Sequence, residues 1–320
     1  MITVNKLSAL ALVLSVFVGG CAAEADAESG GTDDGASSED ALTSLAKAEV
    51  VGTLKASWYA GQAAAPAGQD KATYRAFAFD GVANQKLTAY VVTNNETDPI
   101  AYVLDSHFKE LKRNDDRDAT VKDAALAFTP PATGTYYLAF RTKERTAATV
   151  MARIVDDELG GGLRTRTFVD GWPVRQPRSG EDQYSYEHNK HAVNVSAAVK
   201  AGATSIINSS GCPADPFQPG AGLSIPDGAT FTVDPVARTI SLPGGNVGGS
   251  AQIGSDGSFE FDSGTDRWGF KRASGRVAAG GFVIISHVET MDCSTNSDGR
   301  SVHNARRLDD AIGAADPNYR

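Results

Sequence analysis

The residues best suited to chemistry are one histidine and two carboxylates near the C-terminal end of the chain. His287 directly follows an apolar run at 282–286, and Glu289 and Asp292 come shortly after it. A histidine that a carboxylate orients can act as a general base, so these residues form the candidate catalytic site of a hydrolase. A single histidine at the end of a strand is also a common packing residue, and the sequence alone favours that structural interpretation.

A second pair of histidines is a candidate metal site. His188 and His191 lie three residues apart, so on a helix they would share a face and could bind a metal together with Glu187 or Asp182. On a strand this spacing would point them to opposite faces. The polar surroundings favour an exposed segment before a strand. His188 is also the alternative to His287 as the base of a hydrolase.

An acidic loop in the first half of the chain is the candidate cation site. Asp115, Asp116 and Asp118 bring several carboxylates into one loop, which suits a hard ion such as calcium that prefers oxygen ligands. The loop lacks the spaced carboxylates and the glycine of an EF-hand, and Arg113 and Arg117 can neutralise it. We therefore expect a solvated turn that binds calcium weakly or not at all, and no other cofactor.

The sequence contains no HExxH, GxSxG, P-loop or GxGxxG motif. This absence excludes little, because catalytic triads assemble in space. The glycine-rich segment 243–249 lacks the lysine and the following helix that a phosphate site needs. Trp58, Trp172 and Trp268 could stack on sugars if they were exposed, but tryptophans in such a body usually fill its core.

Two cysteines in the second half predict a disulfide. Cys212 and Cys293 form an isolated pair with no CxxC or CxxH neighbourhood. In an exported protein such a pair is typically oxidised. Closing a loop of about 80 residues would stabilise the second half by about 4 kcal/mol if the effect is one of chain entropy.

Short apolar runs separated by turn residues must position all of these side chains, and they predict an all-β protein. In a first body we expect an antiparallel β-sandwich, in which Asp80 and Gly81 turn the first two strands into a hairpin or meander. Its expected strands span 73–79, 87–92, 100–104, 124–128, 135–140 and 149–154.

A second body of short strands follows, which we expect to form a second antiparallel sandwich or a small barrel. Hairpin turns are predicted at 227–228 and 256–257, because both are Asp-Gly pairs. A short terminal helix is predicted at 306–315. The expected strands span 191–195, 204–207, 230–233, 239–242, 250–253, 258–261, 275–277 and 282–286.

The first body resembles the bacterial pre-peptidase C-terminal domain family. The matching segments are 74–79, 102–105, 114–116 and 133–138, of which the last, Thr-Gly-Thr-Tyr-Tyr-Leu, is the most specific. The match covers about a third of the chain, and Ser106-His107-Phe108 departs from the turn that usually follows the central strand. The resemblance implies a β-sandwich that serves as an accessory module, in some members with calcium.

The N-terminus resembles a bacterial lipoprotein signal. Lys6 precedes an apolar run at 7–18, and Val18-Gly19-Gly20-Cys21 resembles a lipobox. The resemblance implies cleavage before Cys21, acyl chains such as palmitate on that residue, and attachment to a membrane. Ala22, in place of an aspartate, weakly implies the outer membrane. Residues 22–44 carry seven acidic and no basic side chains, a composition that predicts a disordered tether.

These features predict a signal peptide at 1–20, a disordered acidic tether at 21–44, β-domains at 45–155 and 191–320, and a linker at 156–190. The net charge of −9 and the lack of any Lys/Arg-rich stretch argue against nucleic-acid binding. We expect a non-catalytic cell-envelope lipoprotein that binds or scaffolds a carbohydrate, peptide or protein partner. The alternatives are an envelope hydrolase with a histidine-carboxylate site in the second domain, and a purely structural spacer.

Overall fold

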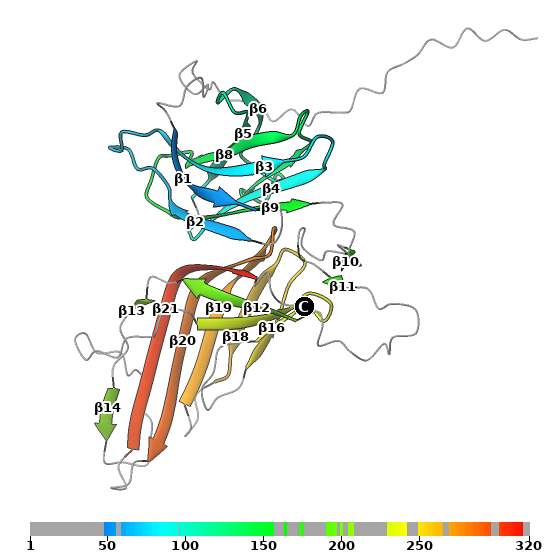
Figure 1. Ribbon diagram of the computed structural model, residues 1–320. Helices are drawn as coiled ribbons and strands as arrows, with labels where there is room; N and C mark the ends of the chain where they lie inside the picture. Colours follow the sequence, from blue (N-terminus) through cyan, green and yellow to red (C-terminus); the bar gives the residue numbers. More distant parts are fainter. Residues whose placement is uncertain are drawn as a thin grey trace, which may run out of the picture. The chain divides into compact units, whose positions relative to one another are not determined.

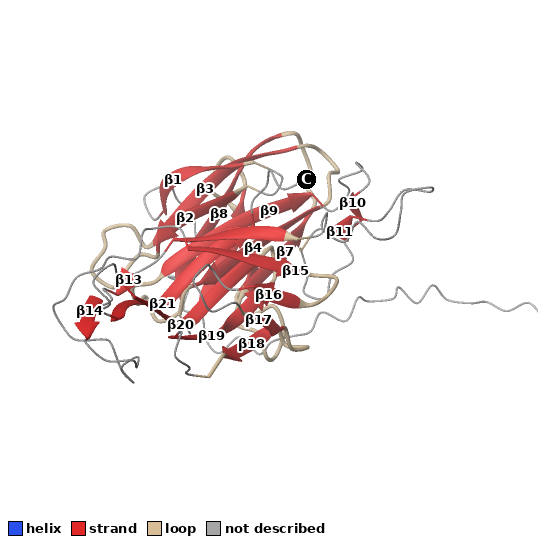
Figure 2. Ribbon diagram, turned by 90° about the horizontal axis from the view of Figure 1, so that it is seen from below, coloured by secondary structure: helices blue, strands red, loops and turns tan. Residues whose placement is uncertain are grey.

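Strands form all of the regular structure in the part of the chain that is described (Figure 2). The computed structural model describes residues 48–55, 59–95, 97–156, 163–164, 172, 174–175, 190–196, 199–200, 204–207, 229–241, 249–264, 269–295 and 301–315. These residues belong to one compact unit, Ala41–Arg320. They include no helix that is long and apolar enough to cross a membrane. The predicted all-β fold class is confirmed.

Two sheets form a sandwich in the first part of the unit (Figure 1). The first sheet has the order β1 (Ala48–Leu54), β3 (Tyr74–Gly81), β8 (Gly134–Thr142), β5 (Pro99–Leu104) and β6 (Glu110–Asn114). The second has the order β2 (Ala60–Ala64), β9 (Thr149–Asp156), β4 (Leu87–Thr93) and β7 (Ala124–Phe128). The pairs within both sheets are antiparallel, except that β1 runs parallel to β3.

The core between these two sheets follows from the alternation of side chains along the strands. Phe77 and Phe140 stack with their ring centroids 5.6 Å apart. They pack with Leu87, Val91 and Ile154 of the opposite sheet, all of which are buried. Every second residue of a strand faces the same side, so a period of two in the sequence suffices to build this apolar layer.

The predicted hairpin at Asp80 and Gly81 is wrong. The strand before it, β3, pairs with β1 and β8 in one sheet, whereas the strand after it, β4, pairs with β7 and β9 in the other. The chain therefore crosses between the two sheets here. A turn signal shows where a strand ends, but the choice of partner depends on residues far away in the sequence. Strand β6 (Glu110–Asn114) was also not predicted, because it lies directly before the acidic loop, in a polar segment.

A ten-stranded sheet forms the second part of the unit, with β13 and β14 both paired to β21 off its main path. The main path runs in the order β17 (Ser250–Gln252), β16 (Thr239–Ser241), β15 (Ala229–Asp234), β12 (His191–Ser196), β21 (Ser301–Ala315), β20 (Phe282–Thr295), β19 (Gly269–Ala278) and β18 (Ser258–Asp262). The shorter strands are β13 (Val199–Lys200) and β14 (Thr204–Ile207), and β10 (Leu163–Arg164) and β11 (Val174–Arg175) form a separate pair.

The sheet is barrel-like and nearly closed, because its two edge strands are consecutive in the chain. A tight turn at Asp256 and Gly257 joins β17 to β18, and the Gly254 amide donates a 2.7 Å hydrogen bond to the Ser258 carbonyl. The predicted turn is present, but β17 pairs with β16 and β18 with β19, so the expected hairpin ladder does not form. The other predicted Asp-Gly turn, at 227–228, lies outside the described residues.

The predicted terminal helix at 306–315 is wrong, because this segment belongs to β21. Several of its residues favour a helix, but β21 pairs with β20 on one side and with β12, β13 and β14 on the other. Pairing on both sides provides partners for the backbone amides and carbonyls, and Ala311, Ile312 and Ala315 become buried. Tertiary pairing therefore overrides the local helix propensity.

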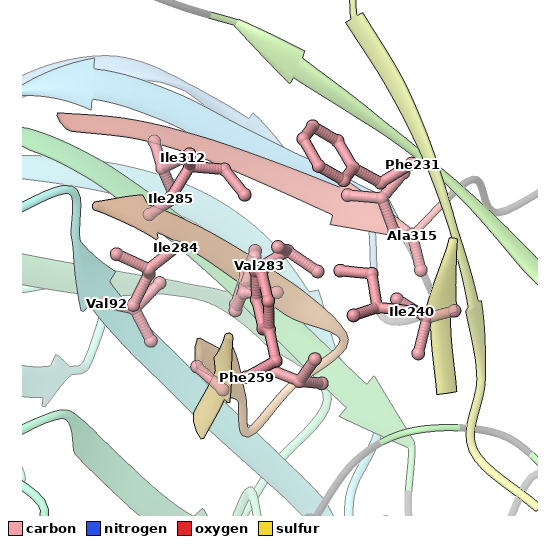
Figure 3. Packing of buried hydrophobic residues seen from close by; sticks show 14 of the residues in the cluster. Val92, Phe231, Ile240, Phe259, Val283, Ile284, Ile285, Ile312 and Ala315 are labelled. Carbon is pink, nitrogen blue, oxygen red and sulfur yellow. The ribbon is translucent and has the colours of Figure 1, made fainter. Parts of the chain in front are cut away.

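The middle strands of the second sandwich sheet are buried on both faces. In β4, Leu87 and Val91 join the core inside the sandwich, whereas Tyr90 and Val92 join the core of the ten-stranded sheet. Figure 3 shows Val92 beside Ile284 of β20. The sandwich and the ten-stranded sheet therefore share a hydrophobic core. The predicted domain boundaries within 155–191 stay a prediction.

A buried arginine joins the two parts at this shared core. The guanidinium of Arg153 in β9 donates hydrogen bonds to the carbonyls of Gly280 at 2.7 Å, Gly281 at 3.3 Å and Ala315 at 2.8 Å. It also lies over the Phe282 ring, 5.1 Å from the ring centroid. Burial lowers the pKa of this guanidinium, which reflects the cost of placing a charge there.

A second arginine bridges the same two parts in the opposite direction. Arg276 of β19 donates two hydrogen bonds to Asp123, directly before β7, with N···O distances of 2.5 and 2.8 Å. The Asp123 side chain is only 3% exposed. A bidentate pair of this kind fixes the orientation of both groups as well as their separation.

Candidate functional site

Three neighbouring strands of the ten-stranded sheet bring a serine, a histidine and an aspartate into one row. His287 of β20 is directly opposite Ser274 of β19 on one side and Asp309 of β21 on the other. The next cross-strand pair, Ala273 and Val288, is buried in the core. Because successive side chains alternate between the faces of a sheet, the row with His287 lies on the face opposite to those two residues.

The pair of His287 and Asp309 is the strongest polar contact of the row. The Nδ1 atom of His287 lies 2.5 Å from Oδ1 of Asp309, and since a carboxylate accepts, the ring nitrogen donates. The Asp309 side chain is 8% exposed and that of His287 is 29% exposed. A buried carboxylate thus sets the orientation of an imidazole that solvent can still reach.

The other ring nitrogen of His287 faces a chain of charged side chains. Its Nε2 atom lies 3.7 Å from Oε2 of Glu289, which is beyond hydrogen-bonding distance. Glu289 in turn lies 3.6 Å from Arg272, and Arg272 lies 3.2 Å from Asp262. The charges alternate along this chain across β18, β19 and β20, as expected for a polar sheet face stabilised by cross-strand pairs.

A β-bulge lies beside the His287–Asp309 pair. Gly275 pairs with Ile285 and Ser274 pairs with His287, so Ser286 is an extra residue in β20. On the neighbouring strand, Asp310 has a φ of 51°, which is unusual for a residue other than glycine. Bulges and such strained positions redirect side chains and often occur next to functional sites.

The sandwich holds the strained position in place. The Nδ2 atom of Asn94 donates a 2.7 Å hydrogen bond to the carbonyl of Asp310. Asn94 is itself fixed, because its Oδ1 accepts a 2.8 Å hydrogen bond from the Thr149 amide. The backbone beside Asp309 is therefore tied to the sandwich as well as to its own sheet.

The sequence singled out His287 and Glu289, which lie on the same face of β20, and their catalytic role stays a prediction. It missed Asp309, because residues 306–315 were predicted to form a helix. Asp292 lies in β20, but its side chain is outside what the structure describes. If residues 306–315 had been interpreted as a strand that pairs with 282–295, the sequence would have indicated a carboxylate opposite His287.

The predicted metal pair receives only a partial test, because His188 lies outside the described residues. His191 starts β12, is 4% exposed, and packs against the Trp172 ring with centroids 5.6 Å apart. Trp172 is a core residue, and its indole nitrogen donates a 2.8 Å hydrogen bond to the Ala278 carbonyl. Trp58 and Trp268 lie outside the described residues.

Two carboxylates of the acidic loop, Asp115 and Asp118, already have partners within the protein. Asp118 accepts hydrogen bonds from the side chain and amide of Thr120 at 2.7 and 2.9 Å and forms an ion pair with Arg117 at 3.2 Å. Asp115 lies 3.2 Å from the Lys143 ammonium. Among the residues with a described position, no group of three His, Cys, Asp or Glu side chains could hold a metal ion. Weak or absent calcium binding at Asp115, Asp116 and Asp118 stays a prediction.

The hydrogen bonds to Asp118 change its acidity. They lower the pKa of this carboxyl group from 3.8 to about 2, with the Thr120 hydroxyl as the largest cause. Asp98 lies near Lys143, the partner of Asp115. The pKa of Asp98 is raised, because that side chain is buried. Lys143 offsets part of this effect from 3.6 Å away.

The proposed disulfide and lipid site are not described by the structure. Cys21 and Cys212 lie outside the described residues, and Cys293 lies in β20 directly opposite His303 of β21. The Cys212–Cys293 bridge and the lipidation of Cys21 therefore stay predictions.

Comparison with known proteins gives matches to structures only. No protein-family model and no curated protein matches the chain. Among solved structures, CorA, a surface-associated copper-binding protein of Methylomicrobium album BG8 important in copper acquisition, is 12% identical. The match covers 33% of this chain and 98% of that one, with a TM-score of 0.27.

A second solved structure of similar extent is the pre-peptidase C-terminal domain of a collagenase from Bacillus anthracis. It is 12% identical, and the match covers 33% of this chain and 93% of that one with a TM-score of 0.25. Membership of the pre-peptidase C-terminal domain family stays a prediction based on the sequence motifs.

Proposed function

We propose that this chain is a cell-envelope lipoprotein, attached to the outer membrane through Cys21, whose β-sandwich acts as a binding or scaffolding module. The partner is a carbohydrate, a peptide or a protein, and the sandwich binds it without a catalytic step. Anchoring needs more than one acyl chain to be stable, which a triacylated cysteine provides.

The observation that carries this proposal is the buried contact of Arg153 with the ten-stranded sheet. A scaffold must hold its parts in a constant arrangement, and Arg153 connects β9 to three carbonyls across the shared core. The Arg276–Asp123 pair adds a second connection. These hydrogen bonds between the two parts support a scaffolding role.

The test of this proposal uses the full chain and its Cys21→Ser variant. We expect the wild-type protein to incorporate labelled palmitate and to fractionate with the outer membrane, and the variant to do neither. The purified protein should bind saturably on an array of envelope glycans and peptides. Unchanged membrane partition of Cys21→Ser, or no saturable binding on the array, would contradict the proposal.

An envelope hydrolase is the second candidate function, and one observation favours it. The sequence placed His287 beside Glu289 or Asp292, but the residue that orients the imidazole is Asp309, at 2.5 Å from Nδ1. A histidine whose Nδ1 is held by a buried carboxylate is the usual arrangement of a general base.

A further inference from the structure

The row of Ser274, His287 and Asp309 contains the three side-chain types of a serine hydrolase in the order that the chemistry needs. His287 is central, with Asp309 opposite on β21 and Ser274 opposite on β19. Directly opposite residues of antiparallel strands have Cβ atoms about 4.5–5.5 Å apart. Ser274 is therefore on the opposite side of His287 from Asp309.

The groups that would have to react with each other make no hydrogen bond to other described residues, although Nε2 of His287 also faces the Glu289 carboxylate. Nδ1 of His287 is bonded to Asp309, but Nε2 is 3.7 Å from Glu289 and makes no hydrogen bond within the described part of the chain. The Ser274 hydroxyl also makes none there. Catalytic hydrogen bonds are often long in a free enzyme and tighten when substrate binds.

From this arrangement we propose that Ser274, His287 and Asp309 form an acyl-transfer site that hydrolyses small carboxylic esters, with Ser274 as the nucleophile. The inference rests on the hydrolase candidate above and supplies the nucleophile and the substrate class. The row lies on a sheet face where the His287 side chain is 29% exposed. An ester is a more suitable substrate for such an open face than an amide. Its leaving group departs more readily, so its hydrolysis needs less stabilisation from surrounding groups.

The reaction needs no oxidant, reductant or second cofactor. Nε2 of His287 takes the proton from Ser274 as Oγ bonds to the ester carbonyl carbon, and the carbonyl electron pair moves onto oxygen. Collapse of this intermediate breaks the bond to the alkoxide, which takes the proton from Nε2. Water then attacks the acyl-serine with His287 as base, which releases the acid and restores the Ser274 hydroxyl.

The bulge and the sandwich fix the geometry of the row. The extra residue Ser286 shifts the register so that His287, and not Ser286, is opposite Ser274. Asn94 of the sandwich holds the Asp310 carbonyl next to Asp309 at 2.7 Å. The backbone beside Asp309, which orients His287, is thus held by both parts of the unit. Surrounding structure of this kind can maintain strained backbone at a site.

The test treats the full-length protein with a fluorophosphonate probe, which reacts covalently with activated serines, and follows hydrolysis of p-nitrophenyl acetate. We expect the probe mass on the peptide that contains Ser274 and a loss of labelling in Ser274→Ala. His287→Gln and Asp309→Asn should slow labelling, the former by about 10²-fold or more, because general base catalysis contributes that much. Ser250→Ala is the matched control, since Ser250 is an exposed serine of β17 that lies outside the row. This variant should label like the wild type.

Absence of labelling in the folded wild type, or labelling that Ser274→Ala leaves unchanged, would overturn the proposal. Thermal unfolding of each variant shows whether lost labelling reflects lost structure. The conservative Ser274→Cys variant should gain reactivity toward a thiol-directed probe if the site is intact. Hydrolysis that depends on His287 but not on Ser274 would retain the hydrolase candidate and reject this nucleophile. Membrane attachment and array binding of Ser274→Ala report on the binding module separately.

Discussion

Arg153 of β9 and Gly280, at the turn between β19 and β20, are joined across the shared core by a 2.7 Å hydrogen bond from guanidinium to carbonyl. This contact connects two parts of the chain that the sequence suggests are separate β-bodies. Gly280 has a φ of 75°, and a Cβ there would lie 2.7 Å from the Tyr90 side chain. Glycine at this position therefore lets β4 and the turn approach closely enough for Arg153 to reach the carbonyls.

Replacing Arg153 with methionine should destabilise the protein by about 3 kcal/mol or more, because buried carbonyls would lose their donors. Chemical denaturation of both proteins measures this difference. Arg117→Met is the matched control, because Arg117 pairs with Asp118 at the surface, where such pairs contribute less than about 1 kcal/mol. Equal effects of the two substitutions would show that the Arg153 contact is not a major link.

Replacing Gly275 with alanine should destabilise the protein by about 1–3 kcal/mol, a usual cost of overpacking. A Cβ at Gly275 would lie 2.2 Å from the Ile284 carbonyl oxygen, so the backbone at the bulge would have to shift. Gly134→Ala is the control, since a Cβ there meets nothing within 4 Å. Thermal unfolding compares the two, and a Gly275→Ala protein as stable as Gly134→Ala would contradict the close approach.

Stability at the acidic loop should depend on pH through Asp118. Its folded pKa of about 2 is below the ordinary value of 3.8, so its hydrogen bonds stabilise the folded state above about pH 4. This contribution is lost as the pH falls from about 4 to about 2. Since the Asp118 side chain is 45% exposed, we expect less than about 1 kcal/mol.

The measurement compares the free energy of unfolding of the wild type and Asp118→Asn at pH 6 and near pH 2. The difference between the two proteins should be present at pH 6 and vanish near pH 2. Thr120→Val removes the hydroxyl donor but keeps the amide donor, so it should give part of the effect. A difference that grows as the pH falls would show that the sign is wrong.

A disulfide between Cys212 and Cys293 should be found by peptide mapping without reduction, because the lipobox resemblance indicates export to an oxidising compartment. Its reduction should destabilise the protein by up to about 4 kcal/mol. Two free thiols after aerobic purification would contradict the bridge and weaken the argument for export.

The sequence determined the local features of this protein. Alternation of apolar and polar residues identified most strands, such as β3 and β9, and turn residues identified where several of them end. His287 and Glu289 share a face of β20 by local geometry alone, because they are two residues apart in one strand, and their catalytic role stays a prediction. Each of these features depends only on neighbours within a few positions of the chain.

The tertiary structure decided which strands pair and in what register. Asp309 is 22 residues from His287 in the chain, and the two meet only because β20 and β21 pair with this register. Register depends on the fit of whole strands against the core, and a shift by one residue would move every side chain to the other face. The sequence also could not predict that β4 and β9 are buried on both faces. Their burial on both faces, which places Arg153 in the shared core, requires a second sheet whose position no local pattern specifies.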